Sequence, residues 1–279
     1  MTGIGNGSPV TGSADGPPVT GVGTGAGLSF APAPAAGSRA GMLAAQTRME
    51  LRLLLRNGEQ VGLTLVIPLL LEFFFNLPLL YSLGTPRRID FVVPSVLALA
   101  VMSASFTGLA IGTGFERKYA VLKRLGATAL PRQVLIGGKT CAVLILQVLQ
   151  AALICLLGLA LGWHPAGGAG WAALLIVAGT FAFGGLGLLL AGTVRAEITL
   201  AAANLAWLVL LFAGGIAIPL SRYPGPAADV LRYLPSAALS DGLHQVLQHG
   251  GGSPWRALAT LLVWAALALP AAGRFFRWE

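Results

Sequence analysis

The chain has 279 residues, of which 56% are hydrophobic and only 10% are charged, and its formal net charge is +8. Soluble domains usually have about a quarter of their residues charged, so this composition excludes an ordinary soluble protein and favours an integral membrane protein. The basic residues fall between apolar runs, where they set membrane orientation, so we expect no nucleic-acid partner.

Residues 1–38 are rich in Gly, Pro, Ser, Thr and Ala, and Asp15 is their only charged residue. Such a composition buries too little apolar surface to offset the chain entropy that folding removes. No basic stretch leads into an apolar run here, so we do not expect a signal peptide. The sequence predicts a disordered, cytoplasmic N-terminal tail, followed by one membrane domain over residues 39–279.

The segment GMLAAQTRMELRLLLRNGEQ, residues 41–60, combines basic and apolar side chains. Arg48, Arg52 and Arg56 recur every four residues, so they share one stripe of a helix. A basic amphipathic helix of this kind is typical of the membrane interface. We therefore predict an N-terminal interfacial helix in contact with membrane lipid. A cytosolic extension of the first membrane span would have a similar composition.

Six long apolar runs follow, and Glu72 is the only charged residue inside them. A membrane-spanning helix needs about 20 consecutive apolar residues, because lipid offers backbone groups no partner outside their own helix. We therefore expect an all-α integral membrane protein with six transmembrane helices. Their predicted bounds are residues 61–83, 91–115, 140–163, 171–194, 198–220 and 257–273.

The distribution of Lys and Arg between these runs predicts the orientation. With the N-terminus inside, 13 basic residues lie on the inner side, and five lie outside: Arg87, Arg88, Arg222, Arg232 and Arg256. Cytoplasmic loops of membrane proteins carry an excess of Lys and Arg. Both termini and the loop over residues 116–139 are therefore predicted to be cytoplasmic.

The stretch FERKYAVLKRLGATALPR, residues 115–132, holds six charges, five of them basic. Residues 116–125 contain good helix formers and neither Gly nor Pro, so we predict one short cytosolic helix. Val121, Leu122 and Leu125 would form its narrow apolar face. The charged residues around that face are Glu116, Arg117, Lys118, Lys123 and Arg124.

A helix that inserts into a groove of a partner protein needs both an apolar anchor and orienting charges. The stretch has both, so we predict that it docks on a cytosolic partner. A solvated turn whose charges only fix the orientation is the alternative.

No residue pattern predicts catalysis in this chain. The run QVLIGGKT, residues 133–140, resembles the end of a phosphate-binding loop, but it lacks the first Gly and leads into a membrane span. Lys139 is instead predicted to be an interfacial anchor. His164, His244 and His249 have no Cys or carboxylate cluster at metal-ligand spacing. We therefore expect neither enzyme activity nor a cofactor or metal site.

Glu72 needs an explanation, because an acidic side chain inside the membrane costs about 3 kcal/mol on insertion scales. Asn76 lies one helical turn away and could form a hydrogen bond with a protonated Glu72. Together with Asn204 in the fifth run, these residues are candidates for a substrate path or a dimer interface. A path would suit a cationic substrate, whereas packing between helices is the simpler interpretation.

In their order, the basic helix, the six runs and the charged loop resemble an ABC-2 type exporter permease, as found in daunorubicin and antibiotic exporters. The loop of that family reads roughly Glu-Arg-x-x-Gly-x-Leu-x-x-Leu-x-x-Thr-Pro, with an Arg shortly after. This chain offers Glu116, Arg117, Leu122, Leu125, Thr128, Pro131 and Arg132. Ala120 stands where Gly is usual, and Ala129 stands where Pro is usual, with Pro131 displaced by two.

A second resemblance follows the fifth run, where the family has a Gly-Gly turn, a Pro, two short extracellular helices and an acidic residue. The similar positions here are Gly214, Gly215, Pro219, Pro224, Pro235 and Asp241. The likeness covers about residues 40–279.

The resemblance implies a multi-pass permease of the bacterial plasma membrane that exports a lipophilic substrate such as a drug, an antibiotic or a lipid-like molecule. It implies a homodimer or a pair with a second permease, driven by a separate cytosolic ABC ATPase that binds ATP and Mg²⁺. Residues 116–125 would then be the ATPase-coupling helix. A membrane-embedded enzyme for lipid or isoprenoid substrates and a non-transporting membrane assembly factor are the alternatives.

Overall fold

A computed structural model describes residues 38–77, 88–128, 130–217, 222–250 and 252–275. Every regular element in these residues is a helix, and they contain no strand. The all-helical prediction is therefore confirmed for the described part of the chain. The predicted disordered tail lies outside that part except for Ser38, whose hydroxyl accepts a hydrogen bond from the Gly41 backbone N–H and caps the first helix.

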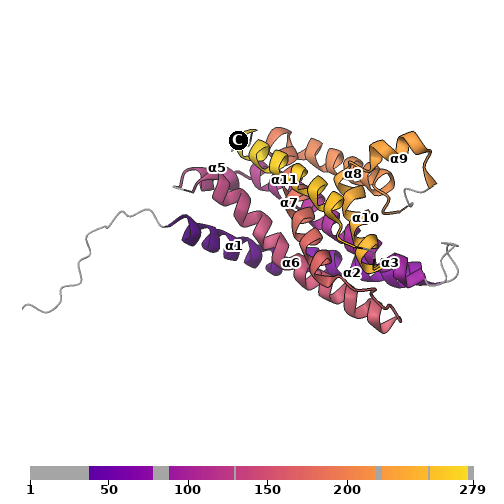
Figure 1. Cartoon of the computed structure of the whole chain (residues 1–279). Coiled ribbons are helices and arrows are strands. Elements are labelled where there is room, and N and C mark those ends of the chain that lie inside the picture. Colours follow the sequence, from indigo (N-terminus) through magenta and orange to yellow (C-terminus); the bar gives the residue numbers. More distant parts are fainter. Residues whose placement is uncertain (1–37, 78–87, 129, 218–221, 251, 276–279) are drawn as a thin grey trace, which may run out of the picture. The chain divides into compact units, whose positions relative to one another are not determined.

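The helices follow one another in the order shown in Figure 1. The first half contains α1 (Arg39–Arg56), α2 (Gly58–Asn76), α3 (Arg88–Met102), the π-helical segment η1 (Ser103–Gly108), α4 (Leu109–Lys118) and α5 (Val121–Gly126). The second half contains α6 (Arg132–Ala160), α7 (Ala169–Thr193), α8 (Ala196–Ala213), α9 (Gly225–Leu231), α10 (Pro235–Leu247) and α11 (Trp255–Phe275). Because α3, η1 and α4 continue without a break, they form one long helix, Arg88–Lys118.

Five helices in the described residues are long and apolar enough to cross a membrane. They are Arg88–Lys118, α6, α7, α8 and α11, and they correspond to five of the six predicted runs. Of the first run, residues 61–83, the structure describes α2, whose apolar part Thr64–Asn76 is shorter than the other five. The chain is thus built as a membrane protein, and the count of six spans stays a prediction.

The glycine-rich helix α7 packs against α11, α10, α4 and η1. Its packing on α11 is close enough that a Cβ atom at Gly185 would lie 2.8 Å from the Cβ atom of Ala268. Leu175 and Phe183 of α7 are fully buried in the same hydrophobic core, together with Leu239 of α10. This core holds in place the long helices that carry the candidate site.

Two further packing contacts bring the ends of several helices together. Helix α1 lies alongside α6 (Figure 1), and α4 packs against both α7 and α8. Side chains at the end of α4 reach Lys139 of α6 and the junction of α7 with α8. The charged stretch identified in the sequence starts at this point.

Candidate functional site

The predicted loop helix is split in two in the structure. Helix α4 continues through Lys118, and α5 begins only at Val121. Between them Ala120 has a φ of 56°, in the left-handed region that turns the chain. The prediction of one helix over residues 116–125 is therefore wrong, because this turn overrides the helix propensity of the segment. The resembling family usually has Gly at this position, and Gly adopts the left-handed conformation without steric strain.

The apolar face predicted for α5 points largely into the chain. Leu122 is fully buried and packs with buried Leu135 of α6, and the partly buried Leu125 and Leu130 lie against this pair. Burying a Leu side chain stabilises a fold by about 1.5–3 kcal/mol, which an outward position would forfeit. The expectation that Leu122 anchors a partner protein is therefore wrong: this side chain supports the loop from inside.

Other residues of this stretch remain accessible. Tyr119 is 67% exposed and Val121 is 36% exposed. Lys123 and Arg124 are exposed next to them. We call these four residues the α5 surface; it combines an apolar pair with two basic side chains.

Two side chains attach the end of α4 to the junction between α7 and α8. Arg117 donates a hydrogen bond to the backbone carbonyl of Val194, the residue that follows α7. The Nζ atom of Lys118 lies 2.6 Å from a carboxylate oxygen of Glu197 in the first turn of α8. Exposed ion pairs contribute little to stability, so the Lys118–Glu197 pair matters mainly for position.

The preceding residue, Glu116, belongs to a buried ion network. Its carboxylate lies 2.6 Å from Lys139 Nζ in α6, and the carboxylate of Glu50 in α1 lies 2.9 Å from the same Nζ. Gln46 donates a hydrogen bond of 2.7 Å to Glu50. Lys139 is only 3% exposed and pairs inside the chain, rather than anchoring it at the membrane interface as the sequence predicted. We call Gln46, Glu50, Glu116 and Lys139 the Lys139 network.

A network of this kind specifies one arrangement of its helices more than it adds stability. Desolvation offsets most of the Coulombic gain of a buried pair, whereas removing one partner costs about 3–5 kcal/mol. Three consecutive residues, Glu116, Arg117 and Lys118, connect the end of α4 to α6, to the α7–α8 junction and, by way of Lys139, to α1.

The close approach of α1 to α6 depends on a glycine. A Cβ atom at Gly138 would collide with Cγ of Gln46, so a larger residue here would force Gln46 or the helix to shift. This approach brings Glu50 to Lys139, the residue next to Gly138. The Gly-Gly-Lys run that resembles a phosphate-binding loop is thus part of a helix–helix contact inside α6. Glu50 is the only acidic residue in α1, and that isolated charge is the sequence signal by which this member of the network could have been found.

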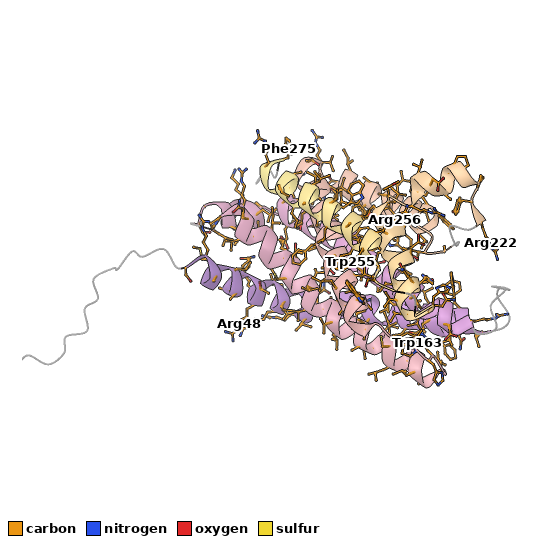
Figure 2. All side chains as sticks on the ribbon, viewed as in Figure 1. Arg48, Trp163, Arg222, Trp255, Arg256 and Phe275 are labelled. Atoms are coloured by element: carbon orange, nitrogen blue, oxygen red, sulfur yellow. The ribbon has the colours of Figure 1, made fainter. Side chains whose placement is uncertain are left out.

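The predicted arginine stripe lies on the outside of α1. Arg48, Arg52 and Arg56 are exposed, and Figure 2 shows Arg48 pointing away from the chain. Met49 and Leu53, which lie next to this stripe, are 39% and 51% exposed. Basic and apolar side chains exposed together are what an interfacial helix presents to a bilayer, although lipid contact itself stays a prediction.

Comparison with known proteins identifies the family of this chain. Residues 87–273, more than half of the chain, match the family described as "ABC-2 family transporter protein". The chain belongs to this family. It is also similar to a protein of Bacillus subtilis (strain 168) named "Putative transport permease YvfS", with 24% identity over 230 residues that cover 81% of this chain and 93% of that protein. The resemblance to an ABC-2 type permease is confirmed, and the chain is a membrane subunit of a transporter.

The region that matches the ABC-2 family contains Glu116, Lys139 and the α7–α8 junction, and it begins after α1. Glu50 and Gln46 therefore lie outside the region by which the family is recognised. Half of the Lys139 network is contributed by the N-terminal helix of this particular ABC-2 subunit.

Glu72 lies in the interior of the ABC-2 subunit, where its side chain is fully buried. A Cβ atom at Gly158 of α6 would lie 3.0 Å from Glu72 Oε1, so the carboxyl group lies against α6. Among the described residues neither carboxylate oxygen of Glu72 has a hydrogen-bond partner, so the predicted bond with Asn76 is not formed there. An interior position is what both the packing and the path hypotheses require.

Asn204 is exposed on α8, beside the exposed apolar side chains of Leu205, Leu208 and Val209. It faces outward, whereas Glu72 faces the interior, so the two residues do not line one path within a single chain. An amide on an outward apolar face suits an interface with another membrane helix, where a hydrogen-bond partner is available.

At α10 the ABC-2 subunit contains a buried histidine. The Nε2 atom of His244 lies 3.2 Å from Ser95 Oγ of α3, and the centre of its ring lies 4.7 Å from that of the Phe91 ring, at a tilt of 43°. Burial lowers the pKa of His244, which keeps the ring neutral at pH 7, and burial raises the pKa of Asp241 in the same helix. Within the described segments no three His, Cys, Asp or Glu side chains are grouped in a way that could hold a metal ion.

Proposed function

We propose that this chain is the permease subunit of an ABC exporter that moves a lipophilic substrate, such as a drug, an antibiotic or a lipid-like molecule, out of the cytoplasm. A separate cytosolic ATPase binds ATP and Mg²⁺ and supplies the energy. A second permease, either another copy or a different subunit, completes the membrane part. Membership of the ABC-2 family supports this proposal. The proposal also includes six membrane spans, with both termini in the cytoplasm of a bacterial cell.

The observation that carries the proposal is the position of the α5 surface directly next to Glu116, Arg117 and Lys118. An ATPase groove that receives Tyr119 and Val121 would be oriented by the charges of Lys123 and Arg124. The bonds of the three preceding residues lead from there to α6, to the end of α7 and to α8. Motion of a docked ATPase therefore changes how these helices are placed relative to one another.

In this arrangement residues 116–125 have separate roles in coupling the ATPase to the spans. The α5 surface binds the ATPase, and Glu116, Arg117 and Lys118 pass its motion to the spans. Leu122 and Leu125 hold α5 on α6 from inside the loop. A substitution at Leu122 would unfold this loop, so it cannot separate docking from folding, and the test uses exposed residues instead.

The test replaces the two exposed apolar residues by acids, as Tyr119→Asp with Val121→Asp in the full chain. We expect co-purification of the cognate ABC ATPase and export of a lipophilic dye to fall by about tenfold or more, since central interface residues typically contribute 2 kcal/mol or more. The matched control is Tyr233→Asp with Val230→Asp, because these residues, just after α9 and in α9, are 64% and 72% exposed. A correctly inserted Tyr119/Val121 variant that binds the ATPase and exports like the control would rule the proposal out.

A further inference from the structure

A shallow groove of about 450 Å³ lies between α1 and α6. Its walls are mainly apolar and include Leu43 and Leu51 from α1 and Cys141 and Ile145 from α6. Arg48 is the only charged residue that lines it. The groove thus combines an apolar floor with one guanidinium group at its edge.

The apolar floor continues along α6 beyond the groove. Ile145, Val148 and Leu149 are 47%, 64% and 46% exposed, although α6 is a candidate membrane span. Exposed apolar side chains on a span face lipid or another membrane helix. A hydrocarbon chain that enters the groove at Leu51 can therefore leave it along α6 without meeting a polar group of these residues.

The positive charge at the edge of the groove is not neutralised by an acidic side chain of α1. Glu50, the only acidic residue of α1, is turned inward to Lys139. The described residues offer Arg48 no ion pair, and Arg52 and Arg56 follow it along the same exposed side. This side of α1 therefore attracts an anion, and Arg guanidinium groups bind phosphate oxygens well.

We propose that this groove binds one anionic phospholipid of the adjoining leaflet, with its phosphate at Arg48 and one acyl chain between α1 and α6. A zwitterionic lipid would bring its own ammonium group towards Arg48, so the charge at the groove selects an anionic headgroup. The bound lipid holds α1 against α6, in the position in which Glu50 reaches Lys139. The site depends on α1 and α6 alone and needs neither ATP nor a transported substrate.

The experiment uses the purified full chain in detergent and counts retained lipids by native mass spectrometry. Phosphatidylglycerol and phosphatidylcholine with identical acyl chains are the two probes. We expect phosphatidylglycerol to be retained more tightly than phosphatidylcholine, and Arg48→Ala to weaken its retention about fivefold, the effect of one basic residue at an anionic surface. Arg56→Ala is the matched control, since it removes the same charge from the same stripe outside the groove.

A second pair of variants tests the apolar part of the site. Ile145→Trp fills the groove and should reduce phosphatidylglycerol retention, whereas Leu156→Trp, at an exposed position of α6 outside the groove, should not. Equal retention of the two lipids, or equal loss in Arg48→Ala and Arg56→Ala, would overturn the proposal. So would an Ile145→Trp variant that converts a dimer to a monomer with unchanged lipid retention, because a second copy would then cover the groove. No ATPase takes part, so failure here leaves the proposed export function standing.

Discussion

Lys139 shares its ammonium group between two carboxylates that come from different helices; Lys139 and Glu50 are buried, and Glu116 is partly exposed. The ammonium group is what allows Glu50 and Glu116 to lie close to one another. Without it the two carboxylates would repel each other in a medium of low dielectric constant. The network therefore acts as a single unit, in which the loss of the central charge matters more than the loss of either acid.

We predict that Lys139→Met destabilises the protein by about 3–5 kcal/mol, because it leaves two carboxylates without their common partner. The compensated variant Lys139→Met with Glu50→Gln and Glu116→Gln carries no charge at the site and should recover most of that loss. Thermal unfolding of the purified protein in detergent measures both. Equal unfolding temperatures of the single and the triple variant would contradict a paired network.

Single residues were predictable from the sequence where they stood out chemically. The charges at residues 116–118 contrast with an apolar chain, and Glu72 contrasts with its span, so both were singled out. Their partners were not predictable, because Glu50 and Lys139 are 89 positions apart and only tertiary packing brings them together. Leu122 was misassigned for the same reason: an apolar stripe on a short helix does not reveal whether it faces the chain's own core or a partner.

Helices α4 and α5 are separated by a turn that depends on the backbone of one residue. Ala120 holds a left-handed conformation, and the Arg124 backbone N–H donates to the Ala120 carbonyl to begin α5. The left-handed conformation costs a residue with a Cβ atom roughly 1–2 kcal/mol. The turn therefore sets the direction of the α5 surface, and the backbone of Ala120 is strained as a result.

We predict that Ala120→Gly stabilises α5, with a net gain of up to about 1 kcal/mol once the extra entropy of Gly in the unfolded chain is subtracted. Hydrogen exchange of the amides in Val121–Gly126 should slow accordingly. Ala127→Gly serves as the control, because Ala127 has a φ of −77° and gains no relief of strain. Faster exchange in Ala120→Gly than in the wild type would show that the turn is not strained.

The long helices were predictable as elements, since each apolar run matches the length that a bilayer requires. Their ends were less predictable. Helix α6 begins at Arg132, well before the apolar run, because its first turns find partners in the loop and in α1 rather than in lipid. Helix α8 ends at Ala213, because the Gly214–Gly215 turn follows and Gly215 has a φ of 71°.

Across the whole described chain, the connections between helices gather in two groups. Ala166, between α6 and α7, donates a backbone hydrogen bond to Leu247 at the end of α10. In the second group, Glu116 near the end of α4 pairs with Lys139 of α6, and Glu197 in the first turn of α8 pairs with Lys118. The structure thus separates two sets of loops, and the family was predictable from the order of these elements. Which set faces the cytoplasm follows from the count of basic residues alone.

We predict that the group containing α5 is cytoplasmic, since inner segments of the proposed topology carry 13 basic residues and outer ones carry five. In a chain whose two native Cys residues are replaced by Ala, an impermeant maleimide should label Ser253→Cys and Ala169→Cys on intact cells. Ala127→Cys should react only after the cells are permeabilised. All three positions are exposed, so a difference in labelling reports the side of the membrane rather than burial. Labelling of Ala127→Cys alone on intact cells would invert the topology, and the α5 surface could then not meet a cytosolic ATPase.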